Sequence, residues 1–259
     1  GAGRPDQHCT EAQRPLRPVV RKASLSGFYE TEPDEQEMIM AHTLKSLFAK
    51  HPDNAPAIGA PGREWMTYGE LKSLSQDVRK ILRSAGIGAT ERVAIVLPNG
   101  PEMAAAFVTV AQSATTAPLN PAYKEEEFAF YLEDLNARAI ILEAGYQGPA
   151  RSAAQRFDMS VIELHPAAKA GQFTLTTEST GAIEDCEPQA DDIALILHTS
   201  GTTSRPKIVP LLQSNIAASA QNIQKSLVLT PDDCCLNVMP LFHIHGLIAA
   251  VTASLAAGA

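Results

Sequence analysis

The sequence predicts an α/β protein with mostly parallel, doubly wound sheets in two subdomains, the second incomplete at its C-terminal end. From about residue 41 onward, strand-length apolar runs alternate with amphipathic helical patterns. A second alternating series follows a mixed, polar stretch at 165–190. With 259 residues, 45% of them hydrophobic and 19% charged, the chain has ordinary globular composition and can bury a sizeable core.

Residues 1–40 are expected to form a mobile N-terminal extension. The stretch 1–28 carries three prolines and scattered arginines, with little apolar periodicity. Residues 30–37 are strongly acidic, which is typical of a solvated segment. An acidic docking tail is the alternative interpretation of these charges.

The first subdomain is expected over residues 41–180. Thr67 and Glu70 have capping-box spacing, which predicts the start of a helix, and Gly86 is interpreted as the glycine that follows its end. Asn99 is expected to cap the next helix, and three consecutive glutamates favour the positive end of a later helix dipole. The predicted helices cover residues 44–48, 67–84, 102–111, 124–135 and 150–157, and the predicted strands cover 56–58, 92–97, 116–119, 138–142, 160–164 and 173–176.

The second subdomain is expected over residues 190–259. It contains, in order, a strand at 193–197, a polar loop, a strand at 207–210, a helix at 215–227, a strand at 235–239 and a helix from about Gly246. Adjacent Cys234 and Cys235 would point to opposite faces of that third strand.

Charge and cysteine usage exclude several classes of protein. The net charge of −8 argues against a nucleic-acid-binding protein, which would favour a basic face. The longest uncharged run, 103–123, is interrupted by glutamine, asparagine and prolines, so we expect no membrane span. The four cysteines form no C-x-x-C pair, which predicts reduced thiols in a cytoplasmic protein.

The polar loop carries the strongest chemical signal. Residues 198–207 read His-Thr-Ser-Gly-Thr-Thr-Ser-Arg-Pro-Lys. Small side chains, hydroxyls, accessible backbone N–H groups and a lysine suit a chain of phosphates. A Walker loop does not fit, because Gly201 has no second glycine before Lys207. The dinucleotide fingerprint fails as well, since Glu91 stands where a glycine is required after Gly86 and Gly88.

This loop resembles the T-S-G-T-T-G-x-P-K-G-V motif of the AMP-forming adenylating enzymes, the superfamily of the acyl-CoA synthetases. Ser204 and Ile208 stand where that motif commonly has glycine. Residues 239–247 resemble the P-x-F-H-x-x-G-L segment of the same family. The resemblance covers about residues 41–259, and its motifs are closest to oxalate–CoA ligase-like enzymes. Further matching stretches are 66–71, 93–102 and 117–123.

The resemblance implies an ATP-dependent carboxylate–CoA ligase that acts on a small carboxylic acid through an acyl-adenylate. It implies ATP, Mg²⁺ and coenzyme A as cofactors. It makes His243 the catalytic candidate, lining the acyl or pantetheine passage. His245 completes a His-x-His pair without a third ligand at metal spacing, so no metal site is expected, and His198 either touches substrate or ends its strand. The residues implied to hold the phosphates are Thr199, Ser200, Gly201, Thr202, Thr203, Ser204 and Lys207.

The later motifs of the family do not occur before residue 259. We therefore expect the C-terminal domain to be absent and the chain to be an N-terminal portion that is not competent alone. The missing C-terminal portion of the same enzyme would be its partner. Two alternatives stay open: an adenylation module that loads a carrier protein, and a non-catalytic nucleotide-binding fragment.

Overall fold

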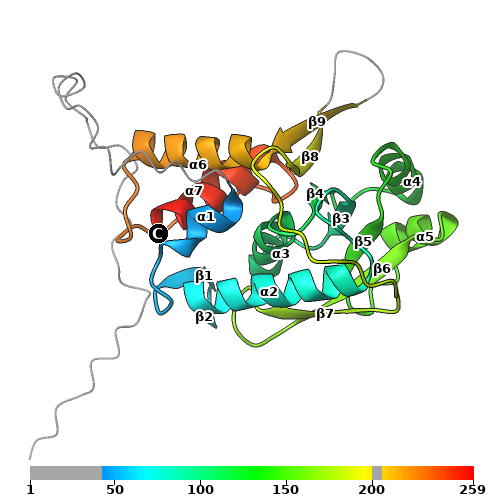
Figure 1. Cartoon of the computed structure of the whole chain (residues 1–259), viewed down its shortest axis with the longest axis horizontal. Helices are drawn as coiled ribbons and strands as arrows, with labels where there is room; N and C mark the ends of the chain where they lie inside the picture. The colour runs from blue at the N-terminus through cyan, green and yellow to red at the C-terminus, as the bar shows by residue number, and fades with distance from the viewer. Residues whose placement is uncertain (1–42, 200–205) are drawn as a thin grey trace, which may run out of the picture. The chain divides into compact units, whose positions relative to one another are not determined.

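The computed structural model describes residues 43–199 and 206–259 (Figure 1). The predicted extension over residues 1–40 lies outside them. The helices are α1 (Leu44–Ala49), α2 (Tyr68–Ser84), α3 (Pro101–Ala111), α4 (Glu125–Asp134), α5 (Pro149–Arg156), α6 (Gln213–Leu227), the π-helix η3 (His245–Thr252) and α7 (Ala253–Ala257). The strands are β1 (Pro56–Ala60), β2 (Arg63–Thr67), β3 (Arg92–Val96), β4 (Thr115–Pro118), β5 (Ala139–Glu143), β6 (Ser160–Pro166), β7 (Phe173–Thr177), β8 (Ile193–Thr199) and β9 (Lys207–Leu212).

The main sheet has seven strands in the order β7-β6-β5-β3-β4-β8-β9. The five inner strands, from β6 to β8 in this order, are parallel to one another. The two edge strands, β7 and β9, each pair antiparallel with their neighbour. This confirms the predicted mostly parallel α/β class. Strand β8 joins β4 through the register pair Thr116 and Leu195, so the first strands of the predicted second subdomain extend this sheet. The division near residues 180–190 stays a prediction.

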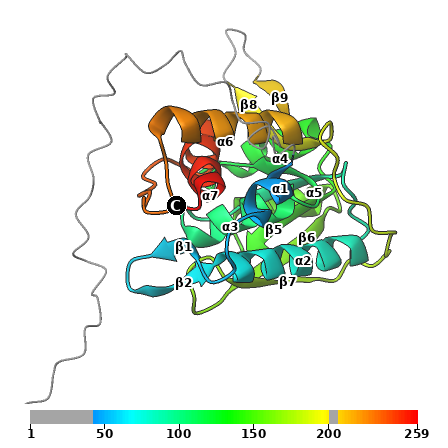
Figure 2. The ribbon, with the colours of Figure 1, turned by 60° about the vertical axis from the view of Figure 1, so that its left-hand side comes forward.

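The sheet has one apolar core on each face, as a doubly wound fold requires. Along β3, Val93 and Ile95 enter the core that α2 and α3 cover, whereas Ala94 and Val96 enter the core covered by α4 and α5. All four side chains are buried. Figures 1 and 2 show the two pairs of helices on opposite sides of the sheet. This alternation explains why the strands of the chain read as continuous apolar runs.

Local helix signals are partly confirmed. Thr67 and Glu70 form the predicted capping box, with the Thr67 amide donating to Glu70 Oε2 at 2.9 Å. Gly86, just past the end of α2, has φ of 75°, a left-handed conformation that suits glycine. The prediction that Asn99 caps α3 is wrong. The N-cap is Gly100, which makes no side-chain cap, and Asn99 bonds to a distant segment instead.

The predicted strand at 235–239 is also wrong. The residues from 233 to 239 form no helix or strand, and Leu236 and Val238 are 72% and 77% exposed. An alternating apolar run becomes a strand only when a neighbouring strand satisfies its backbone, and no described segment pairs with this one. The helix expected from about Gly246 is present, but it opens as the π-helix η3.

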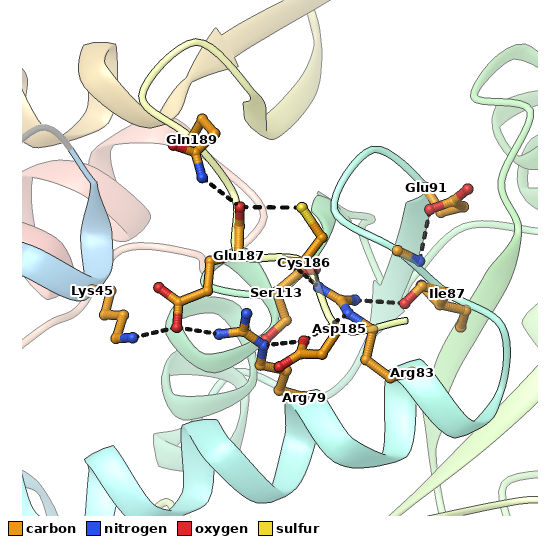
Figure 3. A network of polar contacts seen from close by, with 11 residues as sticks. Lys45, Arg79, Arg83, Ile87, Glu91, Ser113, Asp185, Cys186, Glu187 and Gln189 are labelled. Carbon is orange, nitrogen blue, oxygen red and sulfur yellow. Dashed lines mark hydrogen bonds and ion pairs between the residues drawn. The ribbon is translucent and has the colours of Figure 1, made fainter. Parts of the chain in front are cut away.

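A buried arginine attaches the segment before β8 to α2 (Figure 3). The Arg83 side chain is 6% exposed, and its guanidinium donates to the carbonyls of Ile87 (2.6 Å), Ser113 (2.9 Å) and Cys186 (2.7 Å). Its Nε also donates to the Asp185 carboxylate at 3.2 Å. Arg83 therefore joins the end of α2, the start of β4 and the polar stretch that precedes β8.

A second arginine extends this attachment one turn earlier on α2. Arg79 binds the Asp185 carboxylate at 2.6 Å and the Glu187 carboxylate at 2.8 Å. Glu187 also pairs with Lys45 of α1. The hydrogen bond from Arg79 is the main cause that lowers the pKa of Asp185. The hydrogen bond from Lys45 is the main cause that lowers the pKa of Glu187. The polar stretch is thus held against two helices by charge-assisted contacts.

His51 predicts a pH dependence of stability. Burial, and then the charge of Lys50, lowers its pKa, and Nε2 donates to the Ala256 carbonyl at 3.1 Å. The folded state thus binds fewer protons than the unfolded state, so the free energy of unfolding should fall as pH drops below about 6.5. Urea unfolding at about pH 7.5 and about pH 5.5 measures this. His51→Gln should flatten the dependence, and an equal slope in both proteins would contradict the assignment.

Candidate functional site

The candidate site lies at the carboxyl edge of the parallel strands. Strands β3, β4 and β8 end there. Loops at 97–100 and 119–124 follow β3 and β4, and the polar sequence 200–206 follows β8. Helices α3 and α4, which follow β3 and β4, cover opposite faces of the sheet. Ligands of open α/β sheets commonly bind at such a topological switch point.

The structure brings the two ends of the polar loop together. Thr199 is the last residue of β8, Lys207 is the first of β9, and the two are partners in the antiparallel register. Both residues are exposed. Directly opposed residues of antiparallel strands place their side chains on the same face. The other predicted phosphate ligands, Ser200, Gly201, Thr202, Thr203 and Ser204, lie outside the described residues.

Strand alternation tells which face these two side chains share. Leu195 and Leu197 of β8 belong to the core under α3 and η3, while Ile196 belongs to the core under α4. Thr199 continues the first series, because successive side chains of a strand point to opposite faces. Lys207, its register partner, lies on the same side. The hydroxyl and the ammonium therefore face the side of the sheet on which η3 packs.

The segment that carries His243 is fixed to the same edge. Asn99, just after β3, accepts a hydrogen bond from the Leu241 amide at 2.7 Å and donates to the Met239 carbonyl at 3.4 Å. His243 itself is exposed and packs against the ring of Phe242, with ring centroids 4.6 Å apart. Among the described residues, His243 makes no hydrogen bond or ring contact with Thr199 or Lys207.

The turn before η3 is tight. A side chain at Gly246 would bring its Cβ within 2.5 Å of the Pro240 carbonyl oxygen, so only glycine fits there. The His243 amide donates to the same carbonyl at 3.2 Å, and the His243 carbonyl accepts from Leu247 at 3.2 Å. Gly246 therefore permits the tight turn that places His243 just before η3.

His198 points to the opposite face from Thr199. Its Nε2 lies 2.9 Å from Asp134 Oδ2, its side chain is 6% exposed, and its ring meets the edge of Tyr131 at 4.6 Å. Tyr131 stacks on Tyr123 at 4.9 Å, and burial raises the pKa of Tyr123 above its usual range. The structure therefore packs His198 against α4. Sequence reasoning did not find Asp134, although an acidic residue at the end of a helix is an unusual signal.

A family model described as AMP-binding enzyme matches residues 45–259. The chain belongs to the AMP-binding enzyme family. The match spans both motif regions described above, the loop between β8 and β9 and the segment before η3.

Named relatives agree with this membership. The chain is 37% identical over 222 residues to the oxalate–CoA ligase of Arabidopsis thaliana, covering 83% of this chain and 43% of that protein. It is 39% identical over 186 residues to the oxalate–CoA ligase of Saccharomyces cerevisiae, covering 61% of this chain and 34% of that protein. The chain thus spans less than half the length of these relatives.

A solved structure supports the fold. Apo MatB from Rhodopseudomonas palustris superimposes with a TM-score of 0.71 at 24% identity, covering 85% of this chain and 44% of that one. This chain therefore shares the fold of that structure over most of its length.

A broad groove of about 1340 Å³ lies away from these motifs. It is lined by residues at the amino ends of strands, among them Arg92 of β3, Arg138 before β5 and Ser160 of β6. This edge is opposite to the one at which β8 ends and β9 begins. The candidate site is therefore defined by the motif residues and not by this groove.

The described part of the chain contains no group of three or more histidine, cysteine, aspartate or glutamate side chains arranged to hold a metal ion. No Mg²⁺ ligand is therefore assigned. None of the helices in residues 43–199 and 206–259 has both the length and the hydropathy needed to cross a bilayer.

Asn99→Ala should loosen the His243 segment. It removes the acceptor of the part-buried Leu241 amide, which costs about 1 kcal/mol locally. Hydrogen exchange followed by mass spectrometry should therefore speed up in peptides over residues 237–247. Asn120→Ala is the matched control, because the Asn120 side chain accepts a local hydrogen bond, from the nearby Ala122 amide, at the same sheet edge. Unchanged exchange in Asn99→Ala would contradict the anchoring role.

Proposed function

We propose that the full-length gene product is an ATP-dependent, AMP-forming carboxylate–CoA ligase that acts through an acyl-adenylate. One observation carries the proposal. Thr199 and Lys207, the first and last residues of the stretch T-S-G-T-T-S-R-P-K, are held opposite each other at the carboxyl edge of the sheet. That edge is the usual ligand site of such folds, and membership of the AMP-binding family supports a nucleotide there.

The first half-reaction needs two anions to be aligned. A carboxylate oxygen attacks the α-phosphorus of ATP, and the bond to pyrophosphate breaks. No protein nucleophile is required, so positioning and charge neutralisation carry the catalysis. Lys207 would supply positive charge at the base of the loop, and Thr199 would add a hydroxyl donor. Mg²⁺, when bound, would offset phosphate charge.

The loop between them would wrap the β- and γ-phosphates. Its side chains and backbone amides, from Ser200 to Ser204, suit this role by their chemistry, and their placement stays a prediction. In the second half-reaction the thiol of coenzyme A attacks the acyl carbon, and AMP leaves with the bridging oxygen. His243, presented by the turn before η3, would line the passage through which the acyl group and the thiol meet.

The acid is proposed to be a small carboxylate, with oxalate first among the candidates. Two relatives named oxalate–CoA ligase support this choice. Coenzyme A is the proposed acceptor, and a carrier-protein thiol is the alternative. We further propose that these 259 residues are not competent alone, and that the enzyme works in the cytoplasm, where its thiols stay reduced.

Pyrophosphate release tests this function. The full-length gene product is incubated with ATP, Mg²⁺ and a panel of acids that includes oxalate, with and without coenzyme A. We expect ATP-dependent release with at least one small acid, and sustained turnover only when coenzyme A is present. Release with an acid but no acyl-CoA product would remove coenzyme A as the acceptor. The panel should span short, branched and aromatic acids. If no acid in it gives pyrophosphate release, the assignment as a carboxylate–CoA ligase is wrong.

A further inference from the structure

We propose that His198, held by Asp134 and Tyr131 of α4, is a positioning residue for Thr199 and for Lys207, its register partner. This proposal rests on the proposed function, because Thr199 and Lys207 are taken as nucleotide-binding groups. His198 itself does not touch the nucleotide. It faces α4 on the other side of the strand.

Two contacts fix the imidazole ring. An ionised carboxylate only accepts hydrogen bonds, so the contact of 2.9 Å assigns the ring N–H to Nε2, donating to Asp134. The T-shaped contact with the Tyr131 ring, at 4.6 Å between centroids, fixes the tilt of the imidazole plane. The ring is almost excluded from water. Direction and tilt of the side chain are therefore both determined.

Asp134 has no local reason to be acidic. It is the last residue of α4, and the negative end of a helix dipole disfavours a carboxylate. The last turn of α4 carries no basic residue to offset it. The partner that accounts for the carboxylate is His198, 64 residues further along the chain. Conflicts between local preference and tertiary contact of this kind are concentrated at functional or strained sites.

The register of the hairpin turns this contact into a constraint on the loop. His198 pairs with Ile208, and Ile208 packs into the core under α4 together with Tyr131. Both strands are thus held on the α4 side one residue before the loop. Thr199 and Lys207 must then face the other side. Loss of the contact would let the Thr199 side chain rotate about the axis of β8.

The test separates positioning from simple packing. In the full-length gene product, His198→Ala should raise the KM for ATP about tenfold and leave the KM for the acid within about twofold, because only the phosphate loop loses its base. Asp134→Ala should give the same rise, and the double variant should add little to it. His198→Gln should recover most of the affinity, since its amide nitrogen can reach Asp134.

Glu126→Gln is the matched control. It breaks an ion pair of the same helix, with Arg156 at 2.8 Å, away from the loop, and should leave both KM values unchanged. Thermal unfolding of each variant checks that it is folded, and Asp134→Asn, which removes the charge at nearly constant size, serves if the alanine variants are not, with a rise in the KM for ATP expected. A lower melting temperature with an unchanged KM for ATP would overturn the proposal. An inactive wild-type protein would instead overturn the proposed function.

Discussion

Replacing Arg83 with alanine is expected to lower the free energy of unfolding by about 3–5 kcal/mol. The side chain is 6% exposed, and its removal leaves the carbonyls of Ile87, Ser113 and Cys186 without their donor. A buried carbonyl that has lost its donor costs more free energy than the hydrogen bond itself contributes to stability. The fall in the free energy of unfolding should therefore exceed that caused by breaking an ordinary surface ion pair. Urea unfolding followed by circular dichroism measures it.

Two further variants sharpen this prediction. Arg83→Lys keeps the charge but cannot bridge three carbonyls, so it should recover only part of the loss. Lys80→Ala is the control on the same helix, because its pair with Asp77 is exposed, and the change should stay within about 0.5 kcal/mol. If Arg83→Ala lowers the free energy of unfolding by less than about 1 kcal/mol, the contacts of Arg83 shown in Figure 3 do not have the stabilising role given to them.

The second large effect is expected at Lys207. Lys207→Ala should raise the KM for ATP by about 10–100-fold in the full-length gene product, as the loss of a hydrogen bond to a charged group predicts. Thr202→Ala should weaken ATP binding less, since a hydroxyl is a neutral donor. Steady-state kinetics with varied ATP measures both.

Lys225→Ala provides the control for charge. Lys225 is an exposed lysine in the last turn of α6, and its removal should leave the KM for ATP unchanged. Lys207→Arg should keep part of the affinity, because the charge remains while its geometry changes. If Lys207→Ala and Thr202→Ala both bind ATP as the wild type does, the phosphate roles assigned to the loop are wrong.

Much of the fold could be predicted because it depends on local patterns. The apolar runs of the main sheet were visible in the sequence, as were the capping box at Thr67 and the glycine after α2. Strand β2 was missed, although Pro61 and Gly62 mark the tight turn between β1 and β2, where Gly62 has φ of 73°. Strand β2 runs directly into the helix capped by Thr67, so the strong helical pattern leaves only a short run in which a strand pattern could be recognised.

The errors arose where tertiary contacts override local preference. Asn99 has the ideal residue type for a helix cap, but it satisfies the Leu241 amide instead. The run at 235–239 alternates like a strand, yet no described strand lies beside it. Pairing partners of this kind are far apart in the sequence, so periodicity alone does not find them.

The same distinction applies to the site. The motif predicted that Thr199 and Lys207 belong together, and the strand register brings them together. The pairing of His198 with Asp134 could not be read from the sequence, because it depends on how α4 packs beside β8. The sequence therefore predicts the ligand class, and the structure adds the contact of His198 with α4 one residue before the loop.

Transfer of labelled oxygen tests the central claim most directly. The full-length gene product is given ATP, coenzyme A and an acid that supports turnover, its carboxylate labelled with heavy oxygen, and the nucleotide product is analysed by mass spectrometry. If the carboxylate attacks the α-phosphorus, AMP should carry one labelled oxygen, and pyrophosphate should carry none. Label in inorganic phosphate with ADP as the nucleotide product would contradict an acyl-adenylate.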